Sequence, residues 1–131
     1  MSAQGPLNDA RELLAEIEAA YRRDRATAKG QLRARYAGRH ARFALVAEEV
    51  REDDEGRAFL VMVPPGPRAD GVVLVFFGSG GENPARGFPL GAQATIEGRV
   101  TRVVRGGIFL EDCAIVGDPE DRGGGAPTLA R

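Results

Sequence analysis

The sequence of 131 residues predicts a mainly β protein, a small closed barrel of five strands preceded by N-terminal helices. Apolar residues recur every three or four positions in the first third of the chain and at alternate positions from residue 40 onward. Turn-forming residues interrupt the alternating part about every eight to twelve residues, as in small all-β domains. The length suits one domain, whose core needs neither a disulfide nor a metal.

The helical segment is expected over residues 7–38. Its first helix is marked by an apolar stripe at helical spacing: Leu13, Leu14, Ile17, Ala20 and Tyr21. Asn8 or Asp9 can cap this helix, because a side-chain oxygen there accepts a free backbone N–H. A second, shorter helix is expected from Thr27 to Tyr36, and Gly38 would end it.

The barrel is expected over residues 39–116. Its five strands are expected at His40–Val50, Arg57–Val63, Val72–Phe77, Ala92–Val103 and Ile108–Val116. A five-stranded barrel with Greek-key connections is the OB-fold, and a long first strand suits it because that strand serves both sides of the barrel. The usual helix between the third and fourth strands is not expected, since Gly78–Pro89 has the composition of a loop.

The two ends of the chain are expected to lie outside the folded domain. Residues 1–6 are expected to be flexible, and the Gly/Pro-rich residues 117–131 are expected to form a disordered tail. No apolar run approaches the ~20 residues of a membrane span, and the first residues lack the basic and apolar regions of a signal peptide. We therefore expect a cytoplasmic protein with no membrane partner, although a trimmed export signal would leave the same pattern.

Three stretches of the sequence carry a likeness to a known family. They are a Leu13-Leu14 helix leading to Tyr36-x-Gly38-Arg39, Leu90-Gly91 followed by Ala94-x-Ile96-x-Gly98-x-Val100, and Ile108-x-Leu110-x-Asp112-Cys113-x-Ile115. Over roughly residues 10–116 the chain thus resembles the tRNA-anticodon-binding-like family of small OB-fold domains. The resemblance implies the OB-fold and makes single-stranded nucleic acid the first ligand class to test.

Catalytic and metal-binding residues are scarce. His40 and Cys113 are the only residues of their kinds, so the sequence has no Cys/His metal cluster and no oriented base beside a nucleophile. Cys113 lies in an apolar strand, where a buried structural thiol is expected. Gly78-Ser-Gly-Gly81 is followed by Glu82 instead of the Gly-Lys-Ser/Thr of a phosphate loop, and is expected to be a flexible connection. We therefore expect no enzymatic activity, no cofactor and no metal.

The net charge of −1 conceals a strong segregation of charge. Residues 21–42 hold eight basic residues and one acidic residue, a local charge of +7, whereas the chain from Val46 onward holds nine basic and fourteen acidic residues. The basic segment can contact several phosphates, or it can be a solvated helical face.

OB-folds that bind single strands stack bases on exposed aromatic residues of strands two and three, beside basic residues. The candidate contacts here are Arg39, Arg42, Arg57, Phe59, Phe76, Arg99, Arg102 and Arg105. Phe59 and Phe76 can stack with bases only if they are exposed. Strands two and three are apolar on both faces, so the outward face needs a cover, which the N-terminal helix or a second subunit could provide. The alternative function is a protein-interaction or self-association module that uses this apolar face and has no nucleic-acid role.

Overall fold

The computed structural model describes residues 5–78 and 83–117, and it confirms a mainly β fold with two N-terminal helices. The helices are α1 (Ala10–Arg23) and α2 (Arg25–Tyr36), and a 3-10 helix, η1, spans Pro84–Gly87. The strands are β1 (His40–Glu52), β2 (Ala58–Val63), β3 (Val72–Phe77), β4 (Gln93–Val104) and β5 (Gly107–Gly117). The expected disordered tail lies, apart from its first residue, outside the described residues.

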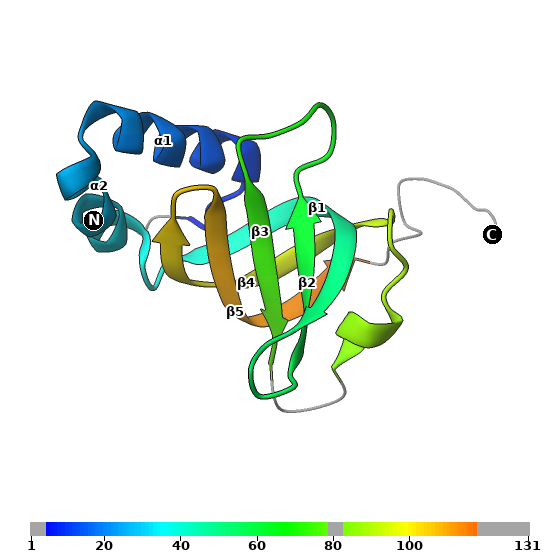
Figure 1. Ribbon diagram of the computed structural model, residues 1–131. Coiled ribbons are helices and arrows are strands. Elements are labelled where there is room, and N and C mark those ends of the chain that lie inside the picture. The colour runs from blue at the N-terminus through cyan, green and yellow to red at the C-terminus, as the bar shows by residue number, and fades with distance from the viewer. Residues whose placement is uncertain (1–4, 79–82, 118–131) are drawn as a thin grey trace.

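The five strands close into a barrel in the order β1-β2-β3-β5-β4, the arrangement expected for an OB-fold (Figure 1). β3 and β5 are parallel, and the other neighbours are antiparallel. β1 pairs with β4 through its first half and with β2 through its second half. A register shift between Ala47 and Glu49 bends the strand where it changes partner.

The two helices are joined at Asp24, which explains why the second helix begins earlier than expected. Asp24 ends α1 by donating its backbone N–H to the Ala20 carbonyl at 3.0 Å, and its carboxylate accepts the N–H of Ala26 at 3.2 Å. With this cap α2 starts at Arg25 and reaches 12 residues, close to the 14 of α1.

In the described part of the chain, no helix is long and apolar enough to cross a membrane.

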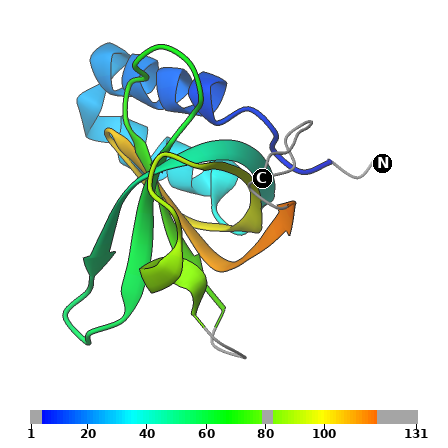
Figure 2. The same ribbon diagram turned by 90° about the vertical axis from the view of Figure 1, so that its right-hand side faces the viewer.

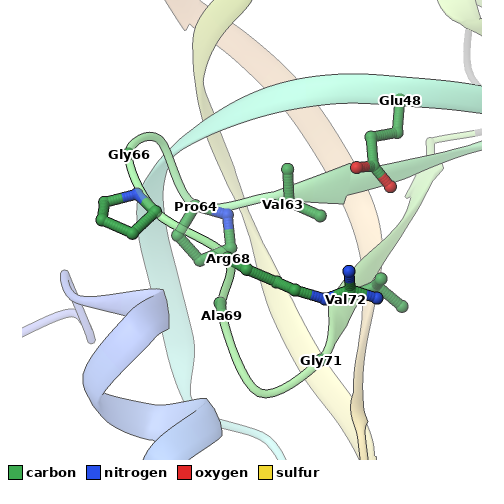
Figure 3. A pocket seen from close by; sticks show the side chains of 9 residues that line it. Glu48, Val63, Pro64, Gly66, Arg68, Ala69, Gly71 and Val72 are labelled. Carbon is green, nitrogen blue, oxygen red and sulfur yellow. The ribbon is translucent and has the colours of Figure 1, made fainter.

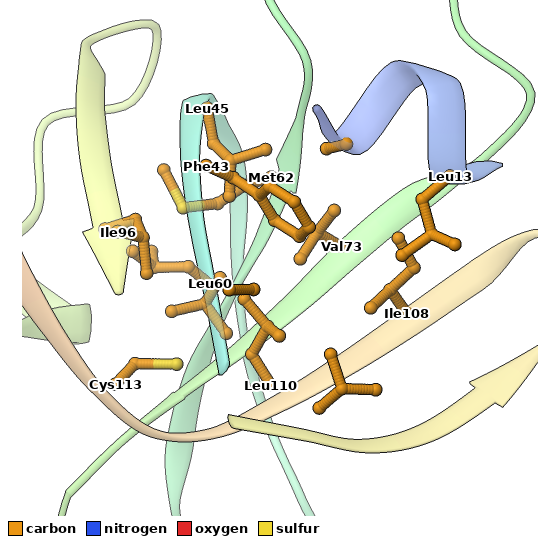
Figure 4. Packing of buried hydrophobic residues seen from close by; sticks show 14 of the residues in the cluster. Leu13, Phe43, Leu45, Leu60, Met62, Val73, Ile96, Ile108, Leu110 and Cys113 are labelled. Carbon is orange, nitrogen blue, oxygen red and sulfur yellow. The ribbon is translucent and has the colours of Figure 1, made fainter. Parts of the chain in front are cut away.

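The core fills the barrel and continues beneath α1. Large side chains with almost no exposed surface occupy the interior: Phe43, Leu45, Leu60, Met62, Ile96 and Leu110. α1 lies across one end of the barrel (Figures 1 and 2), and Leu13 packs in the same cluster as Ile108 of β5 (Figure 4). The apolar stripe predicted for the first helix therefore closes this end of the barrel.

The connection between β3 and β4 contains η1, so the expectation of a loop without a helix was wrong there. Asn83 starts this turn: its side chain accepts the N–H of Ala85 at 3.0 Å and donates to the carbonyl of Ala58 at 3.0 Å. The turn was not predictable from the sequence pattern, because only the cap Asn83 and one buried residue, Ala85, stabilise it. Residues 79–82, which include most of the expected flexible loop, lie outside the described part.

Candidate nucleic-acid interface

Three phenylalanine rings form a row across β2, β3 and β5, on the outer side of the barrel. The ring centroids of Phe59 and Phe76 lie 4.5 Å apart, and those of Phe76 and Phe109 lie 6.3 Å apart. Three aliphatic residues pack beside them, and we call the six together the aromatic face: Phe59, Val61, Val72, Leu74, Phe76 and Phe109. These positions alternate with interior residues, so the two-sided apolar pattern predicted for strands two and three is real.

Neither helix covers the aromatic face. α1 packs across the barrel end and α2 packs against α1 and β4, while β2, β3 and β5 lie open toward the viewer in Figure 1. The N-terminal helix is therefore not the cover of this face, and the second subunit stays a prediction. Phe59 and Phe76 are nevertheless buried, with 9% and 6% of their surface exposed, so the condition that they lie exposed is not met. The two rings stack on each other, and the guanidinium of Arg57 lies over Phe76.

Two arginines lie over the row of rings. The guanidinium of Arg57 is 4.7 Å from the centroid of Phe76, and that of Arg102 is 5.2 Å from the centroid of Phe109. Both distances fall in the range of a cation–π contact. A guanidinium plane in this position can also stack with a nucleobase and bind a phosphate with its edge.

Arg57 is held in place by two carboxylates. Its guanidinium lies 3.3 Å from Asp53 and 3.5 Å from Glu111. The Asp53 carboxylate also accepts the backbone N–H of Arg57 at 2.8 Å and of Glu55 at 2.9 Å. These hydrogen bonds, the one from Arg57 first, lower the pKa of Asp53. The acidic turn between β1 and β2 is thus an ordered structure that positions Arg57, in addition to being exposed to solvent.

The remaining predicted arginines lie elsewhere, mostly in ion pairs. Arg42 pairs with Glu97 at 3.0 Å on the β1–β4 part of the barrel. Nearby, Arg99 pairs with Asp112 at 2.8 Å. Arg39 donates to the backbone carbonyl of Gly5 at 3.2 Å. The structure therefore gathers only Arg57, Phe59, Phe76 and Arg102 of the eight predicted residues at one face.

Arg105 serves as an anchor for α1. It donates two hydrogen bonds to the carboxylate of Glu18, at 2.8 and 3.1 Å. The bonds from Arg105, assisted by Arg22, lower the pKa of Glu18 to about 2, and the pKa of Arg105 is raised. This pair links the first helix to the turn between β4 and β5, so the sequence-based assignment of Arg105 to a ligand has a structural alternative.

Phe109 is the functional candidate that sequence reasoning missed. It faces outward between the buried residues Ile108 and Leu110, and this alternation was visible in the sequence. The sequence did not show that β5 pairs in parallel with β3, and this pairing brings Phe109 next to Phe76. A prediction based on strands two and three alone therefore could not include Phe109.

A cleft of about 400 Å³ lies under the connection between β2 and β3 (Figure 3). Arg11 of α1 holds this connection by donating to the carbonyls of Pro65 at 2.8 Å and Pro67 at 2.6 Å. The charged groups of the lining are the cation of Arg68 and the carboxylate of Glu48. We assign this cleft no ligand.

No cluster of metal-ligating side chains occurs within residues 5–78 and 83–117.

Comparisons with known proteins support the fold. No family model matches the chain, and no curated protein matches it. A similar solved structure is that of a putative nucleic acid-binding lipoprotein from Klebsiella pneumoniae subsp. pneumoniae MGH 78578. It superposes with a TM-score of 0.57 over 85% of this chain and 92% of that chain, at 20% sequence identity. At this identity the likeness establishes a shared fold, and a shared fold does not by itself transfer a function.

Proposed function

We propose that this protein is a non-catalytic OB-fold module that binds single-stranded nucleic acid on its aromatic face. One observation carries the proposal: the row of Phe59, Phe76 and Phe109, with Arg57 and Arg102 over two of the rings. The row lies on the strands by which OB-folds bind oligonucleotides, and it combines the two elements that such binding uses, stacking surfaces and cations. The Klebsiella protein with this fold is a putative nucleic acid-binding lipoprotein, which is consistent with the same ligand class.

Binding requires a rearrangement of Arg57, because its guanidinium occupies the position over Phe76 that a base would take. A phosphate draws the guanidinium away from Asp53 and Glu111, and a base then stacks on the uncovered ring. The two carboxylates compete with the phosphate for Arg57 and lower the affinity. Contacts with phosphates release counterions, so the affinity falls as salt rises. Stacking reads no base edge, and the module is therefore tolerant of sequence.

Fluorescence anisotropy of a labelled single-stranded oligonucleotide tests the proposal. We expect binding at low salt that weakens as salt rises. Replacement Phe109→Ala removes one stacking surface of the row, and we expect it to weaken binding at least about fivefold, since one stacked base contributes about 1–3 kcal/mol. Arg42→Gln is the control, because Arg42 is exposed and pairs with Glu97 away from the aromatic face. Absence of binding at low salt by the native protein would overturn the proposal.

The alternative, a self-association or protein-interaction module, has weaker support. The burial of Phe59, Val61 and Phe76 applies to both functions, because a protein partner would also reach these side chains only after Arg57 moves. The two guanidinium groups over the rings favour an anionic ligand over an apolar protein surface. Sedimentation of the same sample separates the two functions. We expect a monomer that binds the oligonucleotide, and a dimer that fails to bind it would favour the alternative.

We also infer that the chain is a divergent member of the tRNA-anticodon-binding-like family. Two of the resembling stretches lie on the adjacent strands β4 and β5, where Gly98 of one contacts Cys113 of the other.

The cytoplasm is the compartment we propose for the protein, and cell fractionation with a specific antibody would test it.

A further inference from the structure

The basic residues of this protein differ in whether a carboxylate neutralises them. Eight arginines lie within 4.0 Å of a carboxylate, in ion pairs distributed over the barrel and both helices. Within the described residues, no such pair involves Arg25, Lys29 or Arg33 of α2, or Arg102 of β4. Among the described residues, the ion pairs also leave out Arg23 and Arg39 of the basic segment, and Arg39 donates to a backbone carbonyl. Three of these five cations of the basic segment, Arg25, Lys29 and Arg33, form one stripe of α2 at spacings of four residues.

This stripe borders a cleft between α2 and β4. The cleft has a volume of about 250 Å³ and is lined by Lys29, Arg33, Ala37, Thr101, Arg102 and Val103. Its three charged side chains are all cations, they are exposed, and the hydroxyl of Thr101 adds a neutral donor. Lys29 and Arg33 lie one helical turn apart and line the cleft together with Thr101, Arg102 and Val103 of β4. Such a set of donors, with no carboxylate in the lining, suits an oxyanion.

We propose that this cleft binds the phosphodiester backbone of the same strand whose bases lie on the aromatic face, an inference that rests on the proposed function. Arg102 connects the two surfaces, because it lines the cleft while its guanidinium lies 5.2 Å from the centroid of Phe109. Arg25 continues the row of cations one turn beyond Lys29. A row of cations that leads away from a stacking surface fits a chain of phosphates better than a single free anion.

The salt dependence of oligonucleotide binding tests this proposal. The variant Lys29→Gln/Arg33→Gln removes two cations of the cleft and leaves the aromatic face intact. Each phosphate contact with a single strand contributes about 0.7 to the slope of log K against log salt. We expect the slope of the variant to be smaller than that of the native protein by about 1.4, the contribution of two such contacts. Its affinity at low salt should fall at least tenfold.

The matched control is Arg22→Gln/Arg35→Gln, which removes the same amount of charge, one arginine from α1 and one from α2. Both arginines are already paired, with Glu18 and Glu16 respectively, so we expect the native slope. Circular dichroism confirms that each variant is folded. A further titration uses inorganic phosphate at constant ionic strength, which should not displace the oligonucleotide.

Each outcome decides between the two proposals. If the native protein binds and the Lys29/Arg33 variant keeps the native slope, the cleft proposal is wrong and the proposed function stands. If the control variant loses as much slope as the Lys29/Arg33 variant, the loss comes from the change of net charge alone, and the cleft proposal is wrong. Displacement by inorganic phosphate would assign the cleft to a free anion. If the native protein does not bind, both proposals fail.

Discussion

Gly98 of β4 lies so close to Cys113 of β5 that a Cβ atom at position 98 would lie 2.6 Å from the Cys113 Sγ. The two residues meet at a bulge: Glu97 pairs with Ala114 and Arg99 pairs with Glu111, so two residues of β5 oppose Gly98. One of them, Asp112, has a φ of +55°, which Asp tolerates better than most residues. The glycine of one motif and the cysteine of the other are thus one packing unit.

Replacement Gly98→Ala should destabilise the protein. The added Cβ would also lie 3.1 Å from the backbone carbonyl oxygen of Glu111, which cannot move without disturbing the bulge. Overpacking of this kind costs about 1–3 kcal/mol of the free energy of unfolding, measured by urea denaturation. The double variant Gly98→Ala/Cys113→Ala should recover part of the loss, because it removes the sulfur. Native stability in the single variant would show that the contact is not tight.

The thiol of Cys113 should be unreactive in the folded protein. Burial raises its pKa to about 12, so the thiolate that attacks a disulfide reagent is nearly absent at pH 8. We expect no labelling by a chromogenic disulfide reagent at pH 8 and rapid labelling in denaturant, which serves as the control. Rapid labelling of the native protein would contradict the burial of the thiol.

Stability should fall in acid as Glu18 is protonated. Its pKa is about 2 in the folded protein, below its ordinary value of 4.5, because Arg105 and Arg22 donate to the charged carboxylate. The stabilisation is therefore present above pH 4.5 and is lost as the pH falls through 2. Thermal unfolding of Glu18→Gln should show a smaller decrease in Tm over this range. Glu55→Gln, a change in the exposed β1–β2 turn, should keep the native decrease.

Replacement Glu111→Gln should strengthen nucleic-acid binding. Glu111 holds Arg57 at 3.5 Å, and its removal both frees the guanidinium and takes a negative charge from the aromatic face. Exposed ion pairs contribute up to about 1 kcal/mol, so we expect a gain in affinity of up to about fivefold in the anisotropy assay. Glu97→Gln has the same change of charge at the Arg42 pair and should have a smaller effect. A weaker affinity in Glu111→Gln would contradict the competition described for Arg57.

Strand positions were predictable because side-chain alternation is a local property. Val72–Phe77 was predicted with both of its observed ends, and the first strand was predicted two residues short of Glu52. The ion pair between Asp53 and Arg57 is likewise local, because the two residues lie only four positions apart in the sequence. Local signals of this kind survive without knowledge of the tertiary fold.

The pairing of charges was not predictable, because it depends on which elements become neighbours. Arg105 lies 87 residues from Glu18, and only the closure of the barrel under α1 brings them together. Six arginines therefore looked equivalent in the sequence, although the structure separates those in ion pairs from Arg102. The same reason hid Phe109, whose place beside Phe76 follows from the parallel pairing of β3 with β5.

A map of amide chemical-shift changes during titration with a single-stranded oligonucleotide at low salt tests the central claim most directly. We predict that the largest changes occur on the outward positions of β2, β3 and β5, at Val61, Leu74 and Phe109, and at Arg57. The amides of Arg42 and Glu97 should change little. An absence of shift changes, or changes confined to the β1–β4 side of the barrel, would contradict a nucleic-acid interface on the aromatic face.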